Sequence, residues 1–221
     1  MKRTLFGLLV AAGLAATAVL AADAATAKPP LGLPPVPIPA DNPQTPEKVA
    51  LGDKLFDDKR FSSTGQVACA TCHDEKKAFT DSPLRTSEGI KKGGKALTGT
   101  RNAPTVVNSA YFDVQFWDGR SPSLEDQSQH PFLNPVEMGL KDHQPILKIV
   151  RSDPAYVKAF EQVFGKKGAQ VTMKEVQQAI GAFERTQVSG NSPFDRYFYG
   201  GESKAMTDAQ KRGFDIYVNK G

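Results

Sequence analysis

The sequence has few of the side chains that build metal clusters. Its 221 residues include two cysteines, Cys69 and Cys72, and three histidines. A structural zinc site needs a second pair of ligands. There is no second cysteine pair, and His130 and His143 lie far apart in the chain. This scarcity argues against a closed zinc site and leaves the two cysteines to bind each other or a cofactor.

Long runs that alternate between apolar and polar residues are absent, and so is the βαβ pattern of a thioredoxin-like redox site. We therefore expect a mostly α fold. A strong charge excess is absent as well. The formal net charge is +4, and part of it comes from Lys2 and Arg3 in a segment that we expect to be removed. We infer no nucleic-acid partner from so small an excess.

Residues 1–24 have the three-part pattern of a secretory signal peptide. Two cations precede an apolar run that reaches about Leu20, and small-residue sites such as Ala22-Asp23-Ala24 follow. An uncleaved membrane anchor is the alternative, because the run is of marginal length for spanning a bilayer. The alanine-rich end favours cleavage, so we expect export into a bacterial periplasm.

The stretch "VACATCHDEK" holds both cysteines and, directly after them, His73. Cys-x-x-Cys-His is the attachment signal for c-type haem, in which Cys69 and Cys72 form thioethers with the vinyl groups and His73 supplies the axial nitrogen. One helical turn brings both sulfurs to the porphyrin edge. A redox disulfide is the alternative use of the same pair.

Prolines and helix caps divide the rest of the chain. Residues 25–45 form a proline-rich leader that we expect to be extended, because proline disrupts helix and sheet interiors. Thr45 and Pro46 then predict a helix start. The stretches 60–65 and 81–105 lack periodicity, and we expect them to be long loops that wrap the cofactor. Caps and apolar stripes predict further helices at about 123–129, 145–152, 154–164, 172–187 and 207–218.

Several segments in this order resemble the first haem domain of bacterial di-haem cytochrome c peroxidases, including their MauG-like relatives. They are "LGDKLFDDKRFSSTGQVACATCH", "KAFTDSPLRTSEG", "GTRNAPTVVNSAYFDVQFWDGRSPSLEDQ" and "NPVEMG". The resemblance runs from about residue 46 to residue 221. It implies a cytochrome c-like peroxidatic haem domain over residues 46–190 and the beginning of a second cytochrome c-like haem domain over residues 191–221.

The resemblance implies that hydrogen peroxide is reduced to water with electrons from a small donor protein, a c-type cytochrome or a cupredoxin. His73 matches the proximal ligand of the peroxidatic haem, and Gln127 and Glu137 match polar residues of its distal pocket. Trp117 matches a tryptophan between two haems, and Asn102 matches a residue that helps bind calcium. A second haem in the full-length protein and a homodimer are further expectations from the family.

The residue types suit those roles. A carboxylate such as Glu137 can take a proton from one peroxide oxygen and return it to the other, and an amide such as Gln127 can orient peroxide without changing charge. A tryptophan offers a π-system between cofactors. Ordinary alternatives exist for each residue: Trp117 as core, Glu137 as a surface or capping carboxylate, and Asn102 in a turn.

One departure from the family concerns the sixth iron position. Many members place a histidine just after the Ser-x-Gly of the distal loop, whereas "TSEGIKKGG" has Ile90 there. We therefore expect an open distal site, as in the MauG-like branch. His130 is the one candidate substitute ligand, although we expect a polar loop residue, and we expect His143 to be solvent-exposed. The methionines Met138, Met173 and Met206 are expected to pack in the core rather than bind iron.

A second departure is that the sequence ends at "KRGFDIYVNKG" without a second Cys-x-x-Cys-His. We expect a truncation there, before the relay haem. Two other functions compete with peroxidase: an electron-carrier cytochrome with a closed iron, and a MauG-like enzyme that oxidises residues of a partner protein. The distal matches favour peroxidase, because a carrier has no need of them.

Overall fold

A computed structural model describes residues 29–220. The expected signal peptide, residues 1–24, and the first residues of the leader lie outside the described part. The described chain is mostly helical, which confirms the predicted fold class. It divides into two units, one of residues 37–187 and one that joins residues 29–36 to residues 188–220. Within residues 29–220, no helix has the length and apolar character needed to cross a bilayer.

The helices expected from caps and apolar stripes are found, each within a few residues of its expected bounds. In the first unit they are α2 (Pro46–Phe56), α4 (Leu124–Leu133), α5 (Gln144–Ser152), α6 (Pro154–Phe164) and α7 (Met173–Glu184), joined by the short α3 (Cys69–Cys72). Short 3-10 turns lie at Lys59–Phe61, Glu75–Lys77, Ser109–Tyr111 and Gly168–Gln170. The second unit contains α8 (Pro193–Phe198) and α9 (Asp208–Lys220).

Side-chain caps fix where the long helices begin. The Thr45 hydroxyl accepts a hydrogen bond from the Lys48 N–H (3.2 Å), and Pro46 occupies the first turn of α2, where its missing N–H costs nothing. At the start of α7, Glu175 accepts from the backbone N–H of Thr172 (2.7 Å), one half of a capping box. The helix starts are therefore encoded locally.

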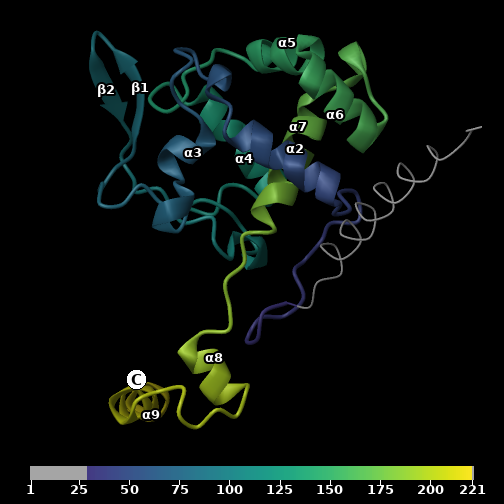
Figure 1. Cartoon of the computed structure of the whole chain (residues 1–221). Coiled ribbons are helices and arrows are strands. Elements are labelled where there is room, and N and C mark those ends of the chain that lie inside the picture. The colour runs from purple at the N-terminus through teal and green to yellow at the C-terminus, as the bar shows by residue number, and fades with distance from the viewer. Residues whose placement is uncertain (1–28, 221) are drawn as a thin grey trace, which may run out of the picture. The chain divides into compact units, whose positions relative to one another are not determined.

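The core of the first unit forms where α2 packs on α7 (Figure 1). A Cβ atom on Gly52 would lie 2.0 Å from the carbonyl oxygen of Ala179, so the two backbones approach more closely than any larger residue allows. Next to this crossing, the rings of Phe56 and Phe183 lie 5.1 Å apart. The apolar face that the α2 sequence predicts is thus buried against α7, and Leu55 retains 1% exposure.

The prediction that residues 81–105 form a loop throughout is wrong. Strands β1 (Glu88–Lys92) and β2 (Lys95–Thr98) form an antiparallel hairpin in which Lys92 pairs with Lys95 (Figure 1). Gly93 and Gly94 form the turn with φ of +58° and +80°, the left-handed values of a two-residue hairpin turn. The strands were missed because each is too short to show alternation.

The hairpin is bound to the turn that follows α4. The backbone N–H of Ile90 donates to the carbonyl oxygen of Glu137 (2.9 Å). A Cβ on Gly89 would lie 2.0 Å from the carbonyl oxygen of Val136, so only glycine permits this approach. The Ile90 side chain packs against Gly139. The hairpin therefore fixes the backbone of the turn that presents Glu137.

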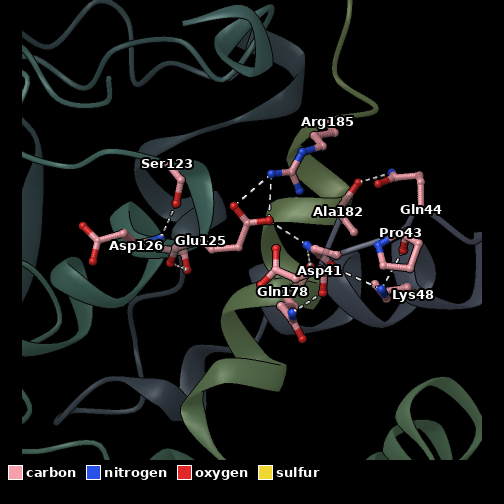
Figure 2. A network of polar contacts seen from close by, with 12 residues as sticks. Asp41, Pro43, Gln44, Lys48, Ser123, Glu125, Asp126, Gln178, Ala182 and Arg185 are labelled. Carbon is pink, nitrogen blue, oxygen red and sulfur yellow. Dashed lines mark hydrogen bonds and ion pairs between the residues drawn. The ribbon is translucent and has the colours of Figure 1, made fainter. Parts of the chain in front are cut away.

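A network of polar contacts fastens the segment before α2 to α4 and α7 (Figure 2). Asn42 donates to Glu125 (2.6 Å) and to the backbone of Gln178 (2.9 Å), and it accepts from the ammonium of Lys48 (2.9 Å). Glu125 also pairs with Arg185 at 2.7 Å, and the Arg185 side chain is 5% exposed. Burial lowers the pKa of Lys48. Removing one member would leave a buried charge unpaired.

The second unit has a small aromatic cluster of its own. The backbone N–H of Asn191 donates to Leu31 (2.7 Å), which joins the leader to the segment before α8. The ring of Phe194 on α8 stacks on Phe198 at 5.3 Å and meets the ring of Phe214 on α9 at 5.1 Å.

Candidate functional site

A cavity of about 460 Å³ lies within the first unit. Its size falls inside the range of about 300–1,000 Å³ typical of ligand pockets. Its wall is built from α2, α3, α4 and α7, from the loops around residues 98–106 and 115–120, and from the turn after α4. All the sequence-predicted site residues line it: Cys69, Cys72, His73, Asn102, Trp117, Gln127 and Glu137.

Helix α3 places the two cysteines one turn apart on the cavity wall. Both are free thiols. Burial raises the pKa of Cys69 and raises that of Cys72 to about 11. Thiol-disulfide exchange needs a thiolate, which a low pKa supplies. These surroundings therefore argue against the alternative redox disulfide.

His73 follows α3 directly and is held in one orientation. Its Nδ1 lies 3.1 Å from the carbonyl oxygen of Phe79. A carbonyl can only accept, so Nδ1 carries the proton and Nε2 keeps its lone pair for a metal. Burial lowers the pKa of His73, which favours the neutral, ligating imidazole. The Phe56 ring packs 6.2 Å from the imidazole.

These residues fit a covalently attached haem. Two thiols for thioether bonds and one imidazole, whose Nδ1 is held by the Phe79 carbonyl, line the same cavity. Much of the remaining wall is apolar, as a porphyrin face requires, with contributions from Phe56, Val67, Val106, Leu124, Met138 and Ile180. Cys69 and Cys72 would attach the haem and His73 would bind its iron.

Gln127 and Glu137 come from α4 and from the turn after it. The Glu137 carboxylate accepts a hydrogen bond at Oε1 from the side-chain amide of Asn134 (2.7 Å). Burial raises the pKa of Glu137, and the positive charge of Arg120 opposes that rise. A carboxyl whose pKa is raised toward neutrality is suited to both accept and donate a proton. The cavity wall thus carries both a carboxyl suited to acid–base chemistry and the neutral amide of Gln127.

Trp117 and Asn102 lie at the edge of the cavity. The Trp117 side chain is 65% exposed, so the alternative that it is a plain core residue is wrong. Its indole N–H donates to the backbone oxygen of Asn102 (2.9 Å), and the Asn102 amide donates to Leu84 (2.9 Å). Residues 29–220 contain no cluster of three or more His, Cys, Asp or Glu side chains that could hold a metal. Calcium binding by Asn102 stays a prediction.

His73 is the one histidine among the residues that line the described cavity. His130, the candidate substitute ligand, is exposed and lies 3.3 Å from Asp126. Ile90 is buried in the core rather than in the cavity wall. The expectation that His143 is solvent-exposed is wrong, because it is half-buried with its ring 6.4 Å from that of Phe132.

Two cavity residues were missed from the sequence. Glu184, on α7, is 6% exposed, and its Oε2 has no hydrogen-bond partner in the described chain. Burial raises its pKa to about 8. Its position four residues after Ile180 on the apolar stripe was a readable signal of an acid on a buried face. Asn134, three residues before Glu137, was hidden because its side-chain partners depend on the turn geometry.

Comparison with known proteins shows which proteins this chain is similar to. The chain is 39% identical over 215 residues to the cytochrome-c peroxidase IdrP1 of Pseudomonas sp. (strain SCT), covering 96% of this chain and 54% of that protein. It is 39% identical over 185 residues to the methylamine utilization protein MauG of Methylorubrum extorquens, covering 84% and 50%. The chain thus spans about half the length of these curated relatives.

Among solved structures, a MauG-like protein associated with microbial copper homeostasis superposes with a TM-score of 0.74 at 33% identity, covering 85% of this chain and 53% of that one. A family model, di-haem cytochrome c peroxidase, matches residues 46–204. These residues include the attachment motif, Gln127 and Glu137. The chain therefore belongs to the di-haem cytochrome c peroxidase family, which implies haem c as its cofactor.

Proposed function

We propose that this chain forms the peroxidatic unit of an exported haem peroxidase that reduces hydrogen peroxide to water. One observation carries the proposal: a single cavity combines a haem-attachment motif with a half-buried carboxylate, Glu137, whose pKa is raised by burial. Gln127 lines the same cavity. Curated relatives called cytochrome c peroxidases support the assignment.

The residues of the chain divide the work of proton transfer. Haem, when bound, supplies an iron that can exchange electrons with peroxide. Ionised Glu137 takes the proton from one peroxide oxygen and returns it to the other as that oxygen leaves as water. The Gln127 amide orients peroxide by hydrogen bonding. Overall, one peroxide, two electrons and two protons give two molecules of water.

We also propose the wider setting of the reaction. The pattern of residues 1–24 supports export to the periplasm. The electrons would come from a small donor protein, a c-type cytochrome or a cupredoxin. A second haem, a calcium ion bound with the help of Asn102, and a homodimer are further parts of this proposal.

The direct test measures peroxide consumption by the haem-loaded chain, supplied with ascorbate and a small c-type cytochrome as electron donor. We expect consumption that depends on the chain and falls steeply in Glu137→Gln. The control is Gln129→Glu, on α4 but outside the cavity wall. A chain that carries covalent, reducible haem and consumes no peroxide would contradict the proposal and favour an electron carrier.

A further inference from the structure

Asn134 ends α4 and contributes to the cavity wall beside Glu137. Its backbone oxygen accepts from the N–H groups of Glu137 (3.1 Å) and Gly139 (2.9 Å). Its side-chain Oδ1 accepts from the N–H of Val136 (3.1 Å), and its Nδ2 donates to Oε1 of Glu137 (2.7 Å). One residue therefore shapes the turn and contacts the carboxylate that the turn presents.

The orientation of the Asn134 amide follows from its partners. A backbone N–H can only donate, so the atom that faces Val136 must be the oxygen. The nitrogen then faces Glu137, and its hydrogen bond favours the ionised carboxylate. The bond occupies Oε1 and leaves Oε2 for exchange with a ligand in the cavity.

Two other groups act on Glu137 electrostatically. Arg120, on the loop before α4, lowers the pKa of Glu137, while burial raises it. The Cys72 thiol of α3 also interacts with Glu137, but it no longer titrates once it forms a thioether. Asn134 is thus the neutral donor whose short-range hydrogen bond opposes the effect of burial on the pKa of Glu137.

We propose that Asn134 is a positioning residue for the peroxide reaction, which holds Glu137 with Oε1 bound and Oε2 available and stabilises its ionised form. This inference rests on the proposed role of Glu137. Asn134 itself transfers no proton.

The test uses the haem-loaded chain with Asn134→Asp. This change keeps an oxygen for the Val136 N–H, so the turn is preserved, and replaces the donor to Glu137 with a second carboxyl. We expect the pH midpoint for the reaction with hydrogen peroxide to rise by about one unit or more, because a neighbouring carboxylate disfavours the ionised form. At a fixed pH below both midpoints, a shift of one unit would make the variant react about tenfold more slowly than the parent.

A second readout avoids turnover. Cyanide binds ferric haem as the anion, so its association from hydrogen cyanide also depends on a base that takes the proton. We expect its pH profile to shift in the same direction in Asn134→Asp. The matched control is Gln129→Glu, because the Gln129 amide donates to Asp126 (3.1 Å) on the same helix, away from the cavity wall. This control adds the same charge and should leave both profiles unchanged.

The outcomes separate the two claims. If Glu137→Gln slows the peroxide reaction but Asn134→Asp leaves both pH midpoints in place, the positioning role is wrong and the proposed function stands. An equal loss at every pH that persists in the Glu137→Gln background would show a structural role only and would also overturn the inference. If Glu137→Gln itself changes nothing, the proposed function fails first.

Discussion

Two carboxylates that line the same cavity, Glu137 and Glu184, have different surroundings. Glu137, on the turn after α4, has a neutral donor at 2.7 Å and the opposing charge of Arg120. Glu184, at the end of α7, has an unpartnered Oε2 within the described chain and a pKa raised by burial to about 8. Both line the cavity, and a positive charge opposes the rise in pKa at each, Arg120 at Glu137 and Arg185 at Glu184. Glu137 also accepts a hydrogen bond from the side-chain amide of Asn134, whereas Oε2 of Glu184 has no partner in the described chain.

In the proposed function Glu137 is the catalytic base, and burial alone would not make it one. Burial favours the neutral carboxyl in both positions, and near pH 7 it leaves Glu184 mainly protonated. A base must spend part of its time ionised, which requires donors or positive charge within reach. At Glu137 the amide of Asn134 and the charge of Arg120 meet that requirement. At Glu184 the charge of Arg185 opposes burial, but burial still raises the pKa to about 8. Glu184 instead behaves as a buried neutral group of the wall.

The largest expected difference in rate is between variants of the two acids themselves. Glu137→Gln should slow the reaction with peroxide by about 10²–10⁴-fold, the usual contribution of a positioned acid–base group. Glu184→Gln replaces a neutral carboxyl with a neutral amide of the same shape and should change the rate by less than about threefold. Stopped-flow mixing of the haem-loaded variants with peroxide measures both, and equal losses would contradict the distinction.

A third carboxylate, Glu125, differs from both because it is paired with the buried Arg185. Glu125→Ala should lower the free energy of unfolding by about 3–5 kcal/mol, because it leaves the buried Arg185 without its partner. The matched control is Asp41→Ala, which removes an exposed ion pair with Lys174 at 3.5 Å. It should cost less than about 1 kcal/mol. Urea unfolding followed by circular dichroism gives both values, and similar losses would argue against a buried pair.

Glu184 should also be visible in the pH dependence of stability. Its pKa is about 8 when folded, against 4.5 ordinarily. Between these values the unfolded chain has lost the proton that the folded chain keeps, so stability should fall by about 1.4 kcal/mol per pH unit as pH rises. Glu184→Gln should remove that contribution and be more stable than the parent at pH 8. If the slope of stability against pH between pH 5 and 8 were the same in Glu184→Gln as in the parent, Glu184 would be ionised in the folded chain.

The smallest effect concerns Arg120, whose side chain is 45% exposed and pairs with Asp118 at 2.7 Å. Arg120→Gln should raise the pH midpoint of the peroxide reaction by less than about one unit, because solvent screens the lost charge. Arg120→Lys keeps the charge and should not move the midpoint. Added salt should reduce the shift. A larger shift than in Asn134→Asp would make charge, rather than the amide hydrogen bond, the main stabiliser of ionised Glu137.

Local signals account for what could be predicted from the sequence. The Cys69–His73 motif lies within one turn and its neighbours, and the helices begin at caps such as Thr45 and Thr172. Gln127 and Glu137 came from the family resemblance, and the structure brings them into the cavity with the motif. The placement of Trp117 at the exposed edge could not be read from residue type alone.

The rest depends on contacts between distant segments. The hairpin carried a usable signal, the Gly93-Gly94 pair between short runs, but its attachment to the Glu137 turn arises only on folding. The role of Asn134 needs a turn geometry that one sequence does not reveal. Glu184 is buried because α2 and α4 cover α7, so its raised pKa is a property of the packing rather than of the sequence around it.

The most direct test of a peroxidatic haem site is the ferric absorption spectrum of the haem-loaded chain before and after one equivalent of hydrogen peroxide. We expect a high-spin iron whose spectrum changes rapidly with peroxide, a change that is lost in Glu137→Gln and retained in Glu184→Gln. A low-spin spectrum that peroxide does not alter would contradict this expectation, because a sixth ligand would then close the iron and the cavity would serve electron transfer.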